Sequence, residues 1–144
     1  MILVDANLLL YAYDPNAAQH EASRLWLEAT LSGSPLVRFS WLTLWAFLRI
    51  VTNPRVFERP LSMAEAEQHV SSWLAQPSAG ILEPGERHWE ILRQITRDGQ
   101  ASGPLLMDAA LAAIAIEHGA TLCTTDRDFA RFAGLTWTNP LASR

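Results

Sequence analysis

Lysine is absent from this chain. All eleven basic residues in the 144-residue sequence are arginines, and the formal net charge is −4 at pH 7. The absence of lysine excludes a Schiff-base enzyme and a P-loop phosphate site, and it argues against phosphotransferases that depend on a lysine. The negative charge argues against a surface covered with phosphate-binding groups. Arginine makes good bidentate phosphate contacts, but we favour a genome-wide preference for arginine codons as the explanation.

Cysteine is scarce and long apolar runs are absent. The single cysteine, Cys123, cannot form a disulfide within the chain and fits a reducing cytosol, so we expect a cytoplasmic protein. No apolar run reaches the roughly 18 residues of a membrane-spanning helix. The apolar N-terminus has no basic leader, so we do not expect a secretory signal. With 49% hydrophobic residues, the chain is expected to fold as one domain over residues 1–144.

Two common kinds of ligand-binding motif are also missing. The seven glycines are scattered and form no G-x-G-x-x-G pattern, which argues against a nucleotide-binding loop. The histidines have no ligand spacing, so we do not expect zinc. We interpret each of the four as a surface residue: His20, His69, His88 and His118.

Short apolar runs alternate with helical segments along the chain. The expected strands are 2–4, 36–39, 80–84, 121–124 and 135–137, and the expected helices are about 6–13, 15–31, 41–52, 63–74, 86–96, 105–118 and 126–132. Ser62 and Glu65 have the spacing of a capping box, and Gly119 is expected to end a helix. The alternation predicts an α/β domain with a mostly parallel sheet covered on both faces. Ligands bind such sheets at the carboxyl ends of the strands.

Aspartates follow or interrupt the most apolar segments. Asp5 directly follows the apolar run 2–4, and Asp126 follows the expected strand 121–124, with Asp128 two residues later. A charged side chain among apolar neighbours is costly unless it is stabilised. Asp108 is the only charged residue between positions 104 and 117, in a helix that is apolar on all sides. A helix of this kind is buried, so we expect Asp108 to face a cleft.

Each aspartate also has a structural interpretation. Asp5 and Asp126 could cap the helices that follow them, and for Asp5 alone this is the better interpretation. Asp108 is harder to explain in this way, because no arginine lies four residues away to pair with it. Taken together, several carboxylates in one cleft cannot all stay ionised without a cation. Mg²⁺ and Mn²⁺ suit such oxygen ligands and also bind phosphates, which indicates metal-assisted attack on a nucleic-acid phosphodiester.

Four segments carry a family resemblance: "ILVDANLLLYA", "FSWLTLWAFLRIVTNPRVF…RPLS", "DAALAAIAIEHGATLCTTDRDFARF" and "GLTWTNPL". They resemble the PIN domain, in particular the VapC-type toxin ribonucleases, over essentially the whole chain. The resemblance implies a PIN-like three-layer α/β/α fold with a central, mostly parallel sheet. It implies Asp5, Asp108 and Asp126 as catalytic, metal-binding acids, Asp128 as a further catalytic acid, and Asn7 and Thr124 as supporting polar residues.

The same resemblance implies an activity and partners. We expect an endoribonuclease dependent on Mg²⁺, with Mn²⁺ as a possible substitute, that acts on RNA, forms a homodimer and is neutralised by a VapB-type antitoxin. One position departs from the family pattern, because Ala46 stands where PIN domains usually carry a glutamate. This leaves open whether one or two metal ions bind. It also leaves an alternative, a catalytically weakened PIN-like module that binds RNA or a protein.

We favour the enzyme because all four aspartates are present together. A third hypothesis is a phosphatase or phosphoacceptor with Asp5 as the nucleophile. The absence of lysine argues against it, and so does Asn7, which stands where that chemistry needs a second acid.

The chain has six tryptophans, and five of them carry a prediction. Trp26, Trp73 and Trp89 lie in amphipathic segments and are expected in the core. Trp41 and Trp45 are four residues apart, on one face of the same expected helix. This pair could belong to the core, to a dimer interface or to an antitoxin groove. We favour an interface, because exposed aromatic residues are common in binding hot spots, and base stacking on RNA is the open alternative.

Overall fold

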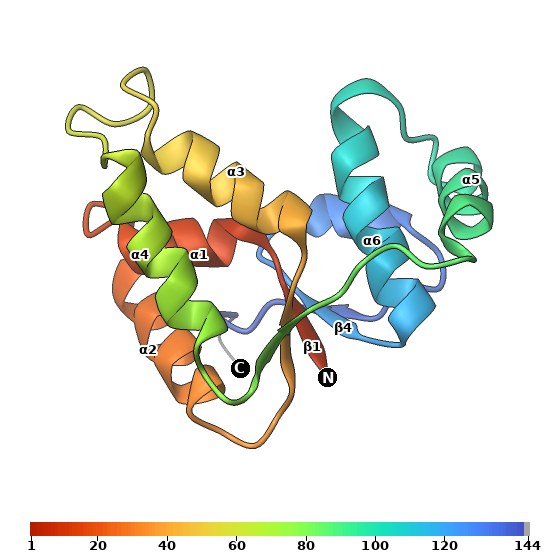
Figure 1. Ribbon diagram of the computed structural model, residues 1–144. Helices are drawn as coiled ribbons and strands as arrows, with labels where there is room; N and C mark the ends of the chain where they lie inside the picture. The colour runs from red at the N-terminus through yellow and green to blue at the C-terminus, as the bar shows by residue number, and fades with distance from the viewer. Residues whose placement is uncertain (143–144) are drawn as a thin grey trace.

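Five parallel strands form one sheet in the computed structural model, which describes residues 1–142 (Figure 1). The last two residues of the expected domain therefore lie outside the described range. The strands are β1 (Ile2–Val4), β2 (Val37–Phe39), β3 (Ala79–Ile81), β4 (Thr121–Cys123) and β5 (Trp137–Thr138). Their order is β3-β2-β1-β4-β5, and every neighbouring pair is parallel. The parallel sheet is thus confirmed, and the carboxyl ends of β1 and β4 lie side by side.

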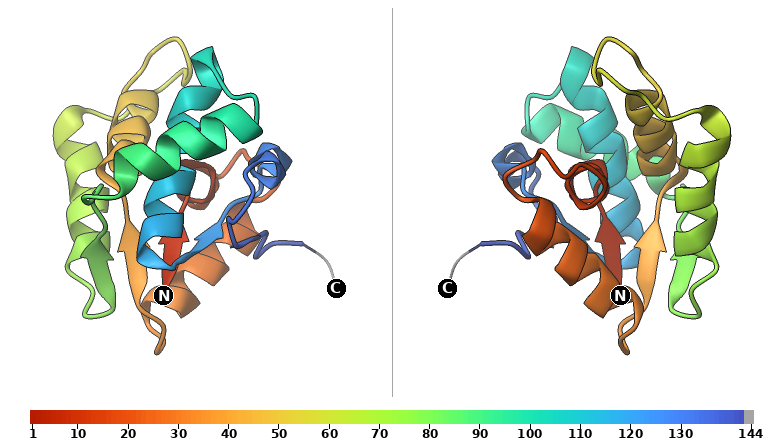
Figure 2. Two further views of the ribbon diagram at one scale, coloured as in Figure 1. Left: turned by 90° about the vertical axis from the view of Figure 1, so that its right-hand side faces the viewer. Right: turned by 90° about the vertical axis from the view of Figure 1, so that its left-hand side faces the viewer.

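Helices cover both faces of this sheet. They are α1 (Ala6–Tyr13), α2 (His20–Leu31), α3 (Trp41–Val51), α4 (Met63–Leu74), α5 (His88–Asp98) and α6 (Leu106–His118), with short 3-10 helices η1 (Gly103–Leu105) and η2 (Arg127–Arg131). The first four helices lie on one side of the sheet, and α5 and α6 lie on the other (Figures 1 and 2). The three-layer α/β/α fold is therefore confirmed. None of the helices in residues 1–142 is long and apolar enough to cross a membrane.

Each face of the sheet has its own hydrophobic core, because successive strand residues point to opposite faces. Leu3 belongs to the core under α5 and α6, whereas Val4 belongs to the core under α1–α4. Cys123 is buried on the side of Val4, as expected for a small core residue. Its burial raises the pKa of the thiol to about 11, so this cysteine is not reactive at neutral pH.

The second helix begins later than predicted, at His20 rather than near Pro15. The Asp14 carboxylate accepts a hydrogen bond from the backbone N–H of Asn16, and the Asp14 carbonyl accepts one from Ala17. An aspartate that bonds the backbone two residues ahead favours a turn over a helix. The other boundaries differ by fewer residues, and the segment predicted as a helix at 126–132 is the 3-10 helix η2.

The predicted helix ends are confirmed. The Ser62 hydroxyl accepts a hydrogen bond from the Glu65 N–H, and the Glu65 carboxylate accepts one from the Ser62 N–H, which completes the capping box. Gly119 ends α6 in the left-handed conformation, with φ of 67°, which glycine adopts at little cost.

The prediction of a buried Trp89 is wrong. Trp73 is buried and Trp26 is half-buried against the same core, but Trp89 is 68% exposed. The helix α5 buries Ile91 and Ile95 instead. Trp89 precedes Ile91 by two residues, which is about 200° around a helix, so its side chain points to solvent.

The prediction of surface histidines holds fully only for His118, which is exposed. The other three histidines are half-buried. His69, for example, packs its ring against those of Tyr13, Phe47 and Trp73.

Candidate active site

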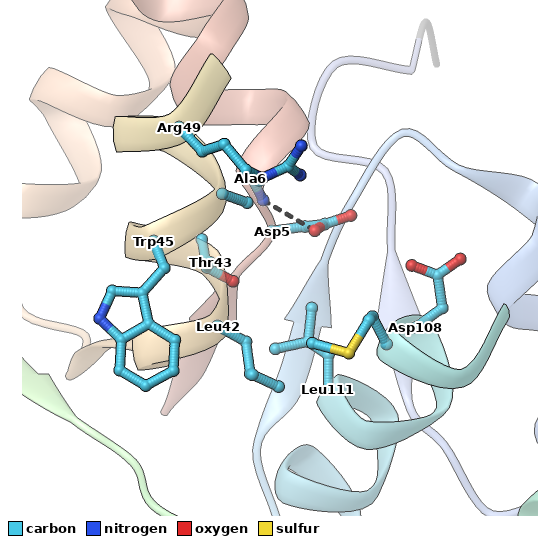
Figure 3. Close-up of a pocket in the computed structure, with 10 residues that line it drawn as sticks. Asp5, Ala6, Leu42, Thr43, Trp45, Arg49, Asp108 and Leu111 are labelled. Atoms are coloured by element: carbon cyan, nitrogen blue, oxygen red, sulfur yellow. Dashed lines mark hydrogen bonds between the residues drawn. The ribbon is translucent and has the colours of Figure 1, made fainter. Parts of the chain in front are cut away.

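A cavity of about 470 Å³ opens where β1 ends, between α3 and α6 (Figure 3). Asp5 follows β1 and Asp108 lies in the first turn of α6, and both line this cavity. The structure therefore brings together two of the predicted site residues that are 103 positions apart in the sequence (108 − 5). The other lining residues are Ala6, Leu42, Thr43, Trp45, Ala46, Arg49, Met107 and Leu111.

Asp5 is held by hydrogen bonds to both carboxylate oxygens. Its Oδ1 accepts the Ala6 N–H at 2.7 Å and its Oδ2 accepts the Thr124 hydroxyl at 2.7 Å. The hydrogen bond from Ala6 caps α1. The interpretation of Asp5 as a helix cap is therefore correct, although capping uses only one of its two carboxylate oxygens. Burial raises the pKa of Asp5, the hydrogen bonds from Thr124 and Ala6 lower it, and the charge of Asp126 raises it; the net shift is upward. The carboxylate is therefore fixed in position and poorly stabilised by solvent.

Asp108 is half-buried, and the pKa of its carboxyl is raised to about 6. Burial is the largest cause, followed by the negative charges of Asp5, Asp126 and Asp128, while the charge of Arg131 opposes them. All four predicted acids are thus close enough to interact electrostatically. A shift from this combination of burial and like charges is typical of functional sites.

Asp126 and Asp128 lie beside the cavity and do not line it. Asp126 caps η2, because its Oδ1 accepts the Asp128 N–H at 2.9 Å. The Asp126 N–H donates to the Thr124 hydroxyl at 3.0 Å, which connects this residue to the partner of Asp5. In their present positions, no three Asp, Glu, His or Cys side chains of residues 1–142 form a group that could hold a metal ion.

Asn7 and Thr124 are part of the same hydrogen-bond network. Thr124 is fully buried, and its hydroxyl accepts the Asn7 Nδ2–H at 3.3 Å. Asn7 also donates to Thr125 at 2.9 Å, a contact that the sequence analysis missed. The Asn7 Oδ1 atom is buried and has no hydrogen-bond partner within residues 1–142. An unpaired buried acceptor is costly, and Asn7 is not among the residues that line the cavity.

The acids of the cavity have the chemistry that a hard divalent cation needs, although in their present positions they do not form a ligand set for it. The candidate ligands are carboxylate oxygens, which bind Mg²⁺. Burial and the neighbouring negative charges raise the pKa values of Asp5 and Asp108, so their ionised forms are poorly stabilised without a cation. A bound cation would stabilise their ionised forms, because an opposite charge within a few ångströms favours the charged state.

The helix α3 contributes cavity residues that the sequence analysis did not identify. Ala46 lines the cavity, so the position where the family usually has glutamate does face the site. Arg49 and Thr43 also line it, and each is three residues from Ala46. Residues three apart lie on one face of a helix. The family resemblance places position 46 at the site, so this spacing could have identified Thr43 and Arg49 as cavity residues.

Trp41 and Trp45 lie on α3 and are not in the core, since they are 37% and 60% exposed. Their exposure rules out the interpretation that the pair belongs to the core. The interpretations as a protein interface and as a base-stacking surface remain.

Comparison with known proteins agrees with this geometry. Residues 2–135 match the PIN domain family. Ribonuclease VapC37 of Mycobacterium tuberculosis is 44% identical over 143 residues, which cover 99% of both chains. VapBC2 of Rickettsia felis, solved bound to a DNA fragment from its promoter, has a TM-score of 0.71 at 17% identity, covering 96% of this chain and 98% of that chain. A toxin-antitoxin complex from Klebsiella pneumoniae has a TM-score of 0.65 at 18% identity, covering 97% and 98%. This chain therefore belongs to the PIN domain family and, within it, to the VapC group.

Proposed function

We propose that this protein is a Mg²⁺-dependent endoribonuclease toxin that cleaves RNA phosphodiester bonds. The observation that carries the proposal is the pair of carboxylates, Asp5 and Asp108, in one cavity, with Asp126 and Asp128 close enough to raise the pKa of Asp108. The ribonuclease name of the 44% identical relative supports RNA as the substrate.

In this proposal Asp5, Asp108 and Asp126 would hold the metal ion. Mg²⁺ held there would lower the pKa of a bound water, which makes it a nucleophile, and would offset the charge that develops on the phosphate. Thr124 fixes the Asp5 carboxylate through its 2.7 Å hydrogen bond, and Asn7 holds Thr124 and Thr125 near that carboxylate. Asp128 adds negative charge beside Asp108, which favours cation binding.

We also propose a VapB-type antitoxin as the partner, a homodimeric assembly and a cytoplasmic location. The antitoxin is supported by the fold similarity to a toxin-antitoxin complex. The homodimer follows from the family resemblance. The single cysteine is buried and free, which is consistent with a reducing compartment.

The proposed activity predicts a strict dependence on divalent metal. Purified protein should cleave RNA in Mg²⁺ or Mn²⁺, lose the activity in EDTA, and recover it when Mg²⁺ is added in excess, because the proposed chemistry needs a divalent ion. Gel analysis of an RNA pool would measure this. The Asp108→Asn protein, purified in the same way, controls for contaminating nucleases. Cleavage that survives complete chelation would rule out the metal mechanism.

A second candidate function, a weakened PIN-like module, is favoured by one observation, which is Ala46 on the cavity wall. We expect Ala46→Glu to increase the affinity for Mg²⁺ about tenfold, because ligand charge tunes such affinities. The same substitution should lower the metal-free stability, because it adds a like charge beside Asp5 and Asp108.

Melting curves over a Mg²⁺ titration would measure both effects. Ala64→Glu makes the same change at an exposed position of α4 and should leave the affinity unchanged. If the two variants bind Mg²⁺ equally, position 46 does not reach the metal. If Ala46→Glu alone creates cleavage that the natural protein lacks, the weakened module is the correct function.

A further inference from the structure

The wall of the cavity that faces the aspartates carries a positive charge. The guanidinium of Arg49 extends toward Asp5 from α3 (Figure 3). Arg49 is exposed, and its guanidinium makes no ion pair or hydrogen bond with any other residue in the range 1–142. An arginine fork suits a phosphate group, which it binds through two parallel hydrogen bonds. An anionic ligand in this cavity would therefore find one free cation opposite the acids.

The same wall contains an unpaired buried hydroxyl. Thr43 is 3% exposed and lines the cavity, yet its Oγ1 has no hydrogen-bond partner in the part of the chain that the structure describes. Buried polar atoms in folded proteins are nearly always paired. A hydroxyl left unpaired at a cavity wall indicates a polar ligand, for which it can both donate and accept.

A second cavity, of about 340 Å³, adjoins the first on the other side of Trp45. Trp45 and Leu42 line both cavities. The other residues of this groove are mainly apolar: Ser40, Trp41, Leu82, Glu83, Pro84 and Ile114. The indole of Trp45 is 60% exposed, so a flat apolar surface lies directly beside the charged cavity.

The far wall of the groove is held in place by hydrogen bonds. The Trp41 indole N–H donates to the Glu83 carboxylate at 3.2 Å, and His118 Nε2 lies 2.7 Å from the Glu83 carbonyl. The Glu117 carboxylate accepts the N–H groups of Gly85 and Arg87 at 2.8 and 3.0 Å. These bonds fix residues 83–87, between β3 and α5. A ligand that enters the groove therefore does not have to order this segment, which reduces the entropic cost of binding.

We propose that α3 forms a nucleotide subsite for single-stranded RNA, in which Arg49 binds a backbone phosphate and Trp45 stacks on the base that lies in the groove. The proposal rests on RNA being the substrate. Aromatic side chains and arginines are the residues that bind unpaired nucleotides. A paired base could not use this surface, because its faces are covered within the duplex.

The position of the groove favours a base as its occupant. The groove shares Trp45 with the acid-lined cavity, so a base stacked there belongs to a nucleotide next to the metal-binding carboxylates.

The test compares two probes of equal charge. One is a uridine octanucleotide, and the other is an octamer of abasic ribose phosphates, which keeps the phosphates and lacks every base. All proteins carry Asp108→Asn so that the probes stay intact, and binding is measured by fluorescence anisotropy. The parent protein should prefer the uridine probe. Trp45→Ala should weaken the binding of the uridine probe about 5- to 150-fold and leave the binding of the abasic probe unchanged.

Two further variants assign the contacts. Trp89→Ala removes a similarly exposed tryptophan from α5 and should behave like the parent. Arg49→Gln should weaken the binding of both probes by the same factor, because a phosphate contact carries no information about the base.

The outcomes separate this subsite from the proposed activity. The subsite is wrong if the parent shows no preference for the uridine probe, or if Trp45→Ala keeps that preference. In the second case, a change in the mass measured by light scattering would assign Trp45 to a protein interface. If the subsite behaves as expected but the natural protein cleaves no RNA in Mg²⁺, the subsite is correct and the proposed enzymatic activity is wrong.

Discussion

Asp108→Asn should abolish the stabilisation of this protein by Mg²⁺ and reduce RNA cleavage on the order of a hundredfold or more. Asparagine keeps the size and polarity of the side chain but removes one of the two negative charges that line the cavity. Binding to the folded state raises stability by mass action. A variant that no longer binds the metal should therefore melt at the same temperature with and without Mg²⁺.

The metal-free protein should respond in the opposite direction. The pKa of Asp108 is about 6 in the fold and 3.8 without it. Because the folded-state pKa is the higher one, the ionised carboxylate lowers stability above about pH 6, and stability is gained as the pH falls through this range toward about 4. Removing the charge should make the metal-free fold as stable at neutral pH or about 1 kcal/mol more stable, a small value because solvent screens a half-exposed group.

Melting curves with and without Mg²⁺, recorded between about pH 7 and about pH 4, measure both effects. The metal-free variant should show a flatter pH dependence than the natural protein. Asp98→Asn, at an exposed position of α5, is the matched control and should keep the full response to Mg²⁺. If Asp108→Asn melts lower without metal and still gains the full Mg²⁺ shift, then Asp108 is a structural residue and the site assignment is wrong.

Phe47→Ala should produce the largest loss of stability, about 3–5 kcal/mol. Phe47 is fully buried on α3, and its ring centroid lies 4.8 Å from that of Trp73 and 6.2 Å from those of Tyr13 and His69. Alanine would leave a void in this cluster, which anchors α3 to α1 and α4. Because the same helix presents Ala46 and Arg49 to the cavity, binding of substrate should weaken as well.

Urea unfolding measures this effect as a lower midpoint with an unchanged slope. Trp45→Ala removes a larger aromatic side chain from the same helix, but that side chain is 60% exposed. A substitution at such a position should change stability by about 0.5 kcal/mol or less. A loss of less than about 1 kcal/mol for Phe47→Ala would mean that the site tolerates a void of this size and that α3 is held by other contacts.

Features that depend only on residues close together in the chain can be predicted from the amino-acid sequence. The capping box of Ser62 and Glu65 and the turn at Gly119 are local structures, so their residue types predict them. The order of strands and helices predicts the parallel sheet, because parallel strands need crossover connections. The carboxyl ends of parallel strands lie along one edge, and this predicts that Asp5 and Asp126 lie close together.

Sequence periodicity alone did not determine which side of a helix is buried. In α5 the spacing of Trp89 to other apolar residues suggested a buried face, but the helix buries the face of Ile91 and Ile95. The predicted start of α2 was also wrong. The hydrogen bond that the Asp14 carboxylate accepts from the Asn16 N–H stabilises a turn, and this turn competes with the helix that the composition favours.

The residues that face the aspartates could not be predicted, because they depend on the packing of the whole domain. Asp108 on α6 and Arg49 on α3 meet across the cavity, although the two helices lie on opposite sides of the sheet. Their approach depends on how each helix packs on its own core, which involves residues far apart in the chain. The exposed indole of Trp45 and the unpaired hydroxyl of Thr43 follow from the same packing. A periodic pattern indicates that a helix has a polar side, whereas the residue opposite that side is set by the packing of the whole domain.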